Sequence, residues 1–251
     1  MTTIPRVIPV LLVSDGYLVK PVRFKGEQYI GDPINAVRIF NEKQVDELVI
    51  CDIDASTVGR GVNYSLIEEV ASEAFMPVGY GGGITTADEA KRVTGIGIEK
   101  VVIGTAAATR PEVVSEVADA LGASSTVVSV DAKRRVGGWD TYVRRGSMRT
   151  GMRPAEAAAR AQRLGAGEIL LSSIDRESSR TGYDLRLIEH VSVAVTVPII
   201  VLGGAGSIQD LAAALNVGAS AVAAGTMFVL NGKHRAPLIS YPSPREIRTL
   251  S

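Results

Sequence analysis

The 251-residue sequence contains a single cysteine, Cys51, which excludes an internal disulfide. A lone thiol is typical of proteins kept in a reducing compartment. The sequence also lacks a run of about eighteen apolar residues, the length needed to cross a bilayer. It has no charged, apolar and small-residue leader at its N-terminus. These absences predict a cytoplasmic protein with no membrane partner.

The chain has no net charge, because 27 basic residues balance 27 acidic ones. Bulk electrostatics therefore give no reason to expect a nucleic acid as a partner. One local stretch differs, because residues 133–153 contain several lysines and arginines against the lone Asp140. Such a stretch is either a solvated loop or a loop that faces an anionic ligand, and the sequence leaves both open.

Motifs for metals and common cofactors are missing as well. Neither histidine, His190 or His234, nor Cys51 has the spacing of a metal site. The chain has no nucleophile elbow, P-loop or dinucleotide-binding fingerprint. We therefore expect neither a metal nor a cofactor.

Short apolar runs alternate with longer amphipathic stretches, and 46% of the residues are hydrophobic. Strands are predicted at 6–13, 47–52, 76–80, 100–104, 126–131, 168–173, 198–202 and 221–224. Helices are predicted between most of them, at 33–43, 87–94, 111–120, 154–164 and 207–215. Continuous apolar strands separated by helices are typical of a parallel sheet covered on both sides. With a chain near the usual length of about 250 residues, the pattern predicts one α/β domain over 1–251, a (β/α)8 TIM barrel.

The sequence also repeats itself at an offset of 121 residues. The segments MPVGYGGGI and VPIIVLGGAG correspond, as do VVIGTAA and VAAGTMF. The matched pairs are Pro77 and Pro198, Gly82 and Gly203, Gly83 and Gly204, Gly104 and Gly225, and Thr105 and Thr226. Self-similarity at one period marks a repeated structural unit. We therefore expect a two-fold repeat of half-barrels, about 1–122 and 123–251.

The repeated glycines follow strands and precede helices, where a backbone without side chains can approach an anion closely. Each half adds a threonine hydroxyl at the end of its next strand. The pattern predicts two phosphate-binding sites, one per half, in a protein that takes a phosphorylated small molecule. The alternative is a set of tight turns without a ligand. The expected phosphate-binding residues are Gly82, Gly83, Gly104, Thr105, Gly203, Gly204, Gly225 and Thr226.

Carboxylates near strand ends are candidates for proton transfer. Asp131 is the best of them, because it terminates an apolar run, whereas Asp54 and Asp175 suit a helix cap or an ion pair equally well. Charges of alternating sign stand at the opposite ends of four strands. On physical grounds alone these charges indicate a stabilising ring beneath the barrel. They are Arg6, Glu47, Lys100 and Glu168.

With these residues identified, the chain from about 6 to 228 resembles the HisF family, the cyclase subunits of imidazole glycerol phosphate synthase. The most specific segments are VIPVLL, GDPINAVRIFNEKQVDELV, YGGGI, VDAKR, GAGEILLSSIDR, GYDL and GGAG. The resemblance implies a HisH-like glutaminase subunit docked at the N-terminal face, with ammonia passing through the barrel. The family's ammonia gate falls on Arg6, Glu47, Lys100 and Glu168, and its flexible-loop lysine on Lys20 in the loop after the first strand.

The chain departs from this family at the opposite end. Of the family's two catalytic aspartates, Asp131 matches the second, but the first falls on Leu12 and its cysteine neighbour on Val10. A leucine cannot transfer a proton. The chain differs at three further places. Gly104 stands where the family has a phosphate-binding asparagine, Glu177-Ser178 where it has an Asp-Gly pair, and Leu202 where it has a serine.

These departures resemble a subfamily of HisF-like proteins from surface-polysaccharide gene clusters, linked to acetamidino modification of sugars. The shared features include VIPVLL without the aspartate, DIDAS, and a tail over 232–242 that replaces the expected terminal helix. That resemblance implies a further partner, an ATP-dependent amidotransferase that uses the ammonia, and a phosphorylated or nucleotide-sugar small molecule as ligand.

The sequence leaves three alternatives to this function. The chain could be a histidine-pathway cyclase that tolerates Leu12, or a non-catalytic ammonia conduit or scaffold. It could also be an unrelated phosphosugar isomerase, which would give no reason for the four charges.

Overall fold

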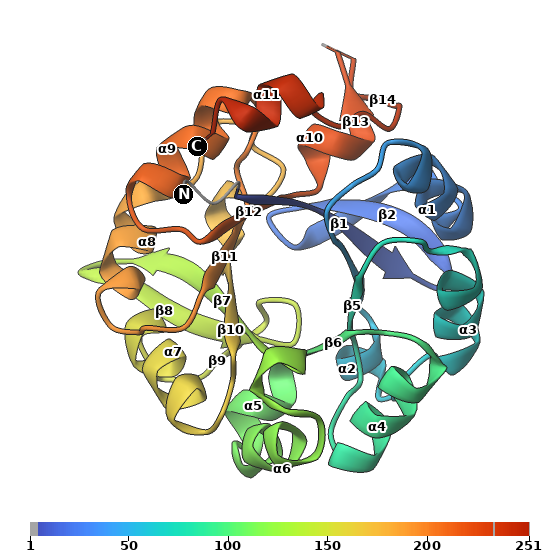
Figure 1. The fold of residues 1–251 in the computed structure, drawn as a ribbon. Helices are drawn as coiled ribbons and strands as arrows, with labels where there is room; N and C mark the ends of the chain where they lie inside the picture. Colours follow the sequence, from blue (N-terminus) through green and yellow to red (C-terminus); the bar gives the residue numbers. More distant parts are fainter. Residues whose placement is uncertain (1–4, 233, 251) are drawn as a thin grey trace.

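The computed structural model describes residues 5–232 and 234–250, so Lys233 of the C-terminal tail motif lies outside the described residues. Within them, parallel strands close into a barrel (Figure 1). The barrel strands are β1 (Arg6–Ser14), β4 (Leu48–Asp52), β5 (Val78–Gly81), β6 (Lys100–Ile103), β7 (Thr126–Arg135), β10 (Glu168–Ser173), β11 (Ile199–Leu202) and β12 (Ala221–Ala224). Each barrel strand pairs with the next one in this order, and β12 pairs with β1 to close the barrel. The predicted (β/α)8 barrel is confirmed, with most strands within two residues of their expected bounds.

Helices surround the barrel on its outer side (Figure 1). The longer ones are α1 (Pro33–Glu42), α3 (Tyr64–Glu73), α4 (Ala87–Ile96), α6 (Glu112–Leu121), α7 (Pro154–Arg163), α8 (Leu185–Ser192) and α9 (Ile208–Asn216). The short ones are α2 (Ala55–Val58), α5 (Thr105–Thr109), α10 (Thr226–Val229) and α11 (Pro244–Arg248), with 3-10 turns η1 (Ala123–Ser125) and η2 (Ile174–Arg176). No helix among the described residues is long and apolar enough to span a membrane.

Side chains pack in two layers on either side of the strands. Val7, Leu11 and Val37 belong to the outer layer between strands and helices. Ile8, Val49 and other inward-facing residues fill the barrel interior. Because strand residues alternate between the two faces, both layers come from the same continuous apolar runs.

Two antiparallel hairpins extend the barrel beyond its strands. The first consists of β2 (Tyr17–Val22) and β3 (Lys25–Gly31), and the second of β8 (Gly138–Val143) and β9 (Met148–Arg149). Two expectations are therefore corrected. Lys20 lies on strand β2 and not in a loop, and β7 runs four residues past Asp131 before turning into β8.

The two-fold repeat extends beyond the matched glycines. Helices α3 and α8 are capped at their N-termini by Asn63 and Asp184, which lie 121 residues apart, and each side chain accepts a hydrogen bond from the helix backbone. Helices α4 and α9 both begin with a capping box, at Thr86 and Ser207. Strands β2 and β8 have the same offset. The hairpins, caps and barrel strands thus follow one repeated plan.

The chain ends in a compact tail that contains β13 (Leu230–Asn231), β14 (Ala236–Pro237) and α11. The Tyr241 hydroxyl donates to the Val7 carbonyl oxygen at 2.8 Å, and its ring packs against Phe228. The tail therefore holds the chain end against the first barrel strand, and the short helix α11 stands in place of the longer terminal helix that the family pattern suggested.

Candidate functional site

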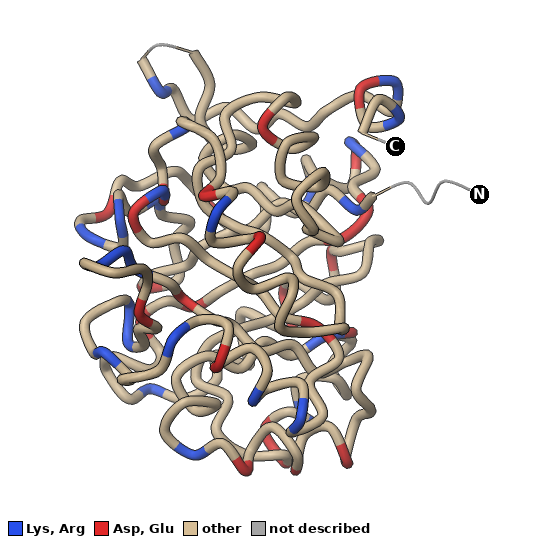
Figure 2. The backbone as a smooth tube through the Cα atoms, turned by 90° about the vertical axis from the view of Figure 1, so that its left-hand side faces the viewer, with Lys and Arg blue, Asp and Glu red and all other residues tan. Residues whose placement is uncertain are grey.

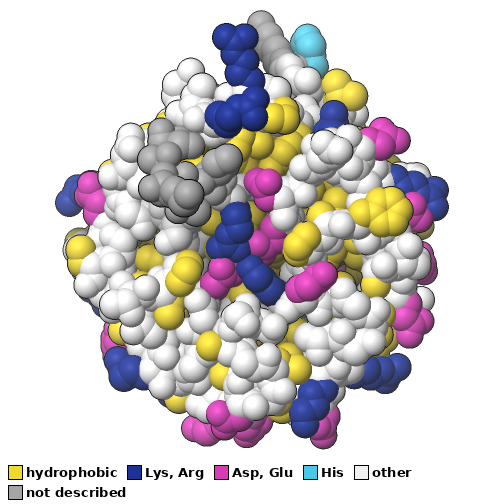
Figure 3. All heavy atoms as spheres, in the orientation of Figure 1, with side chains coloured by type: hydrophobic (Ala, Val, Ile, Leu, Met, Phe, Trp, Pro, Cys, Tyr) yellow, Lys and Arg dark blue, Asp and Glu magenta, His cyan; other side chains and the backbone are white. Residues whose placement is uncertain are grey.

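A closed ring of four charged side chains lies at the end of the barrel where the strands begin. Figure 3 views this end, and charged side chains of both signs gather at its centre. Arg6 donates to Glu47 at 2.6 Å and to Glu168 at 2.5 Å, while Lys100 donates to the same carboxylates at 3.1 and 2.9 Å. Each carboxylate therefore receives both cations. We call these four residues the charged ring.

Burial would lower the pKa of Arg6, but its hydrogen bonds and ion pairs with Glu168 and Glu47 raise the pKa above its ordinary value. The guanidinium therefore stays charged. Buried charges are tolerated when each has partners of opposite charge, and every member of the ring has two such partners.

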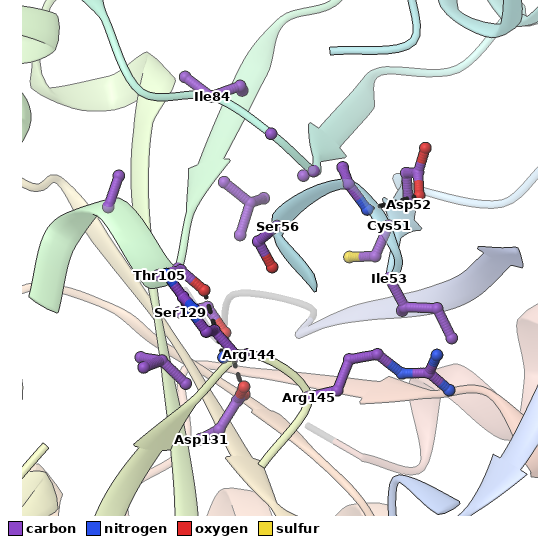
Figure 4. A pocket seen from close by; sticks show the side chains of 18 of the residues that line it. Cys51, Asp52, Ile53, Ser56, Ile84, Thr105, Ser129, Asp131, Arg144 and Arg145 are labelled. Atoms are coloured by element: carbon purple, nitrogen blue, oxygen red, sulfur yellow. Dashed lines mark hydrogen bonds between the residues drawn. The ribbon is translucent and has the colours of Figure 1, made fainter. Parts of the chain in front are cut away.

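A cavity of about 540 Å³ opens at the other end of the barrel, where the strands end. Its floor includes the interior side chains Val10, Leu12 and Leu202, and its walls come from the loops after the strands. Figure 4 shows Asp131, Thr105, Cys51 and Ser129 around this space. The cavity and the charged ring thus lie at opposite ends of the same barrel.

Asp131 is the carboxylate best placed for proton transfer in this cavity. Burial raises the pKa of Asp131 to about 7, a hydrogen bond from Ser129 Oγ at 3.2 Å opposes the shift, and the Glu177 carboxylate adds to it. A group with this pKa can donate or accept a proton near neutral pH. The Cys51 thiol is unsuited to this role, because burial raises its pKa to about 12. Leu12 contributes only an apolar surface to the cavity.

The raised pKa of Asp131 makes a pH-dependent prediction for stability. In the unfolded chain an aspartate has a pKa of about 3.9. Between about pH 4 and pH 7 the folded protein holds a proton that the unfolded chain has lost, so this group's contribution to stability falls as the pH rises. Asp131→Asn should therefore unfold at a higher urea concentration than the wild type at about pH 8. At about pH 5 the difference should shrink, and a gap that is equal at both pH values would contradict the assignment.

The first-half glycines and threonine line the cavity. Gly82, Gly83, Gly104 and Thr105 all face it. A Cβ atom at Gly83 would lie 2.3 Å from the Gly61 carbonyl carbon, so only glycine fits between these two loops. The Thr105 hydroxyl accepts from the Arg144 backbone N–H at 3.3 Å, which joins the second hairpin to the cavity wall.

The second-half residues surround a separate, much smaller space of about 10 Å³. Gly203, Gly204, Gly225 and Thr226 line it, together with Glu177, Ser178 and Arg180. Lys20 and Glu177 form a buried ion pair between this space, which Glu177 lines, and the larger cavity, which both residues line. Lys20 is therefore only 5% exposed, and it is paired on a strand, unlike the flexible-loop residue that the sequence suggested.

The other strand-end carboxylates make structural contacts. Asp52 accepts from the backbone N–H groups of Asp54 and Ala55, each at 3.1 Å. Asp54 accepts from Ser14 at 2.5 Å and from Arg145 at 2.7 Å. Asp175 accepts from the Arg134 backbone N–H at 2.6 Å. Their side chains hold loops and hairpins in place, as the alternative interpretation of Asp54 and Asp175 had it.

The basic stretch of residues 133–153 forms the second hairpin and its connection to α7. In the side view of Figure 2, Lys and Arg segments gather along the left-hand edge, opposite the N-terminus. Several arginines surround the buried Asp140, with Arg149 Nε 2.8 Å from its carboxylate. Arg145 instead spans Asp54 and Glu27. The stretch is therefore held both by ion pairs with its own Asp140 and by ion pairs with Asp54 and Glu27.

Sequence reasoning missed the participation of Glu177 and Ser129 in these surroundings, whereas Arg144 belongs to the basic stretch that it left open to an anionic ligand. Glu177 was recognised only as a departure from a motif, although the 121-residue offset pairs it with Ser56, another cavity residue. No group of His, Cys, Asp or Glu that could hold a metal ion is found within residues 5–232 and 234–250.

Comparison with known proteins places the whole barrel in one family. The model of the histidine biosynthesis protein family matches residues 6–235. A Leptospira interrogans protein named "Putative imidazole glycerol phosphate synthase subunit HisF" is 45% identical over 98% of both chains. The hisF2 protein of Pseudomonas aeruginosa, described in the same words, is 48% identical over 96% of this chain and 97% of its own. The imidazole glycerol phosphate synthase subunit HisF of Thermococcus gammatolerans is 39% identical over 89% of this chain and 88% of its own.

Proposed function

The chain belongs to the histidine biosynthesis protein family, and we propose that it is the HisF-like synthase subunit of a glutamine amidotransferase. In this proposal a glutaminase partner docks at the strand-start end of the barrel. Its ammonia passes the charged ring and reaches the cavity that holds Asp131. The product is an acetamidino sugar for a surface polysaccharide such as O-antigen, made with an ATP-dependent amidotransferase as a further partner.

One combination of features carries the proposal. The charged ring is complete, with each carboxylate held by both Arg6 and Lys100. At the cavity end, by contrast, Leu12 occupies the position where the resembling cyclases have a catalytic aspartate. A complete charged ring at one end of the barrel and an altered cavity at the other end favour a changed acceptor over a lost activity.

The second candidate is imidazole glycerol phosphate synthase itself, acting in histidine biosynthesis. The names of the relatives favour it, and so does Asp131, whose pKa suits acid–base catalysis. It requires a reaction that usually employs two carboxylates to proceed with one. Loss of a positioned acid or base typically costs about 10²–10⁴-fold in rate.

Deletion of the gene in its own organism separates the two candidates. We expect the deletion strain to grow without histidine, because the protein does not supply the histidine pathway. We also expect mass spectrometry of its surface polysaccharide to show the loss of acetamidino groups, and a plasmid copy of the gene to restore them. A strain that requires histidine and keeps its acetamidino groups would refute the proposed function and support the second candidate.

A further inference from the structure

The two halves of the barrel can be compared residue by residue, because equivalent positions lie 121 residues apart. We propose that the ligand of this barrel carries one terminal phosphate, which binds at the first-half site, because a carboxylate of the chain itself fills the second-half site. The inference rests on the proposed function only in taking the cavity as the acceptor site. It extends that function by naming the class of ligand.

The glycines at the ends of β6 and β12 show the difference most directly. A Cβ atom at Gly104 would have its nearest neighbour, Ser129 Cβ, at 3.8 Å, so the space above Gly104 is open. A Cβ atom at the equivalent Gly225 would lie 2.6 Å from Lys20 Nζ. The lysine of the first hairpin therefore covers the second-half glycine.

The residues after β4 and β10 explain what holds Lys20 there. Glu177, which is 3% exposed, pairs with Lys20 beside Gly203, Gly204 and Gly225. Its equivalent in the first half is Ser56, whose smaller and uncharged side chain lines the open cavity. The chain thus places a fixed anion in one half and leaves the matching position in the other half without one.

The two equivalent threonines also differ in how much space surrounds them. The Thr226 hydroxyl is 5% exposed and is bonded to Ser178 Oγ at 2.9 Å, and Ser178 also donates to the Pro21 carbonyl oxygen at 2.7 Å. Thr105 lies on the wall of the 540 Å³ cavity, whereas Thr226 borders only about 10 Å³. A phosphate has room beside Thr105 and none beside Thr226.

Charge follows the same division. Glu177 lines the second-half space and pairs with Lys20, so a phosphate that entered this space would meet a carboxylate. At the first-half site the exposed side chain of Arg144 has no ion pair within the described parts of the chain. A cation without a carboxylate partner is available to a phosphate there. Space and charge therefore both select a ligand with one anionic end.

The test compares two probes, the monophosphate and the bisphosphate of the same straight-chain diol, titrated into the purified protein by calorimetry. The wild type should bind both with dissociation constants that differ by about twofold at most, the advantage of having two equivalent ends. Wild-type binding of the bisphosphate ten times tighter than the monophosphate would overturn the inference. So would failure of the monophosphate to bind at millimolar concentration.

Two matched variants exchange the residues that differ between the halves, Glu177 and Ser56. Glu177→Ser should free Lys20 and tighten binding of the bisphosphate by at least about tenfold, with little change for the monophosphate. Ser56→Glu should weaken monophosphate binding by at least about tenfold, because it places a carboxylate in the open site. If Glu177→Ser does not fold, Ser56→Glu still tests the open site, and unchanged monophosphate binding by that variant would contradict the inference.

These titrations use no ammonia and no sugar, so they can fail independently of the proposed function. Tight bisphosphate binding by a protein that is needed for acetamidino groups would overturn the single-phosphate inference and leave the function standing. Near-equal binding of the two probes by a protein that is needed for growth without histidine would refute the proposed function and support the single-phosphate inference.

Discussion

Replacing Asp131 with asparagine should lower the rate of ammonium-dependent acetamidino formation by about 10²–10⁴-fold, the usual cost of losing a positioned acid or base. Asparagine has nearly the same shape and keeps the contact with Ser129 Oγ, but it cannot take up or release the proton. Leu12 lines the same cavity, so no second carboxylate stands at the position that the resembling cyclases use. The rate would be measured with ammonium as the nitrogen source, in extracts that contain the amidotransferase partner.

Asp175→Asn is the matched control for this substitution. Asp175 also lies beyond a barrel strand, but it accepts from the Arg134 backbone and does not line the cavity. Its substitution should leave the rate within a few-fold of the wild type. If Asp131→Asn proved equally harmless, the barrel would act only as a conduit for ammonia, and chemistry on this subunit would be refuted.

Replacing Lys100 with methionine should abolish most glutamine-dependent formation and destabilise the fold. The substitution leaves Glu47, whose side chain is 4% exposed, and Glu168 to share Arg6 alone. Removing one partner from a buried ionic group typically costs about 3–5 kcal/mol, and we expect about 3 kcal/mol here because the Lys100 side chain is 18% exposed. Urea unfolding gives this value.

Two measurements separate the role of the charged ring in ammonia passage from its role in stability. The ratio of glutamine-dependent to ammonium-dependent formation should fall by about tenfold or more in Lys100→Met, because ammonium in the medium can reach the cavity directly. Lys91→Met removes an exposed lysine of α4 whose nearest carboxylate lies at 3.7 Å, and it should change neither quantity. A Lys100→Met protein with lower stability but an unchanged ratio would restrict the ring to a structural role.

The barrel could be predicted from the sequence because its signals are local. Apolar runs such as Glu168–Ser173 are bounded by turn residues and separated by amphipathic stretches, and each maps onto one strand. The two hairpins could not be predicted in the same way. The first hairpin turns at Arg23-Phe24 in left-handed conformations, positions that asparagine and glycine usually occupy and therefore signal. The second turns over residues 144–147, where Arg144 and Arg145 are left-handed and Gly146 is the one glycine.

The candidate site also has a part that could be predicted from local sequence signals and a part that could not. The charged ring was predictable because its members begin strands, and strand starts share one end of the barrel. The closed second-half site was not, because Lys20 and Glu177 come from distant segments that meet only in the folded barrel. The sequence does show that Ser56 and Glu177 are equivalent at the repeat offset. Only the fold shows that Ser56 lines the open cavity and that Glu177 lines the closed second-half space.

The most direct test of a changed acceptor site is turnover of the histidine-pathway intermediate by the purified protein with ammonium, followed by formation of imidazole glycerol phosphate. The substrate of this assay is the one that the resembling cyclases use, and ammonium removes any need for the glutaminase. We predict no formation above the background of the Asp131→Asn variant. Robust formation of imidazole glycerol phosphate by the wild type would contradict the account.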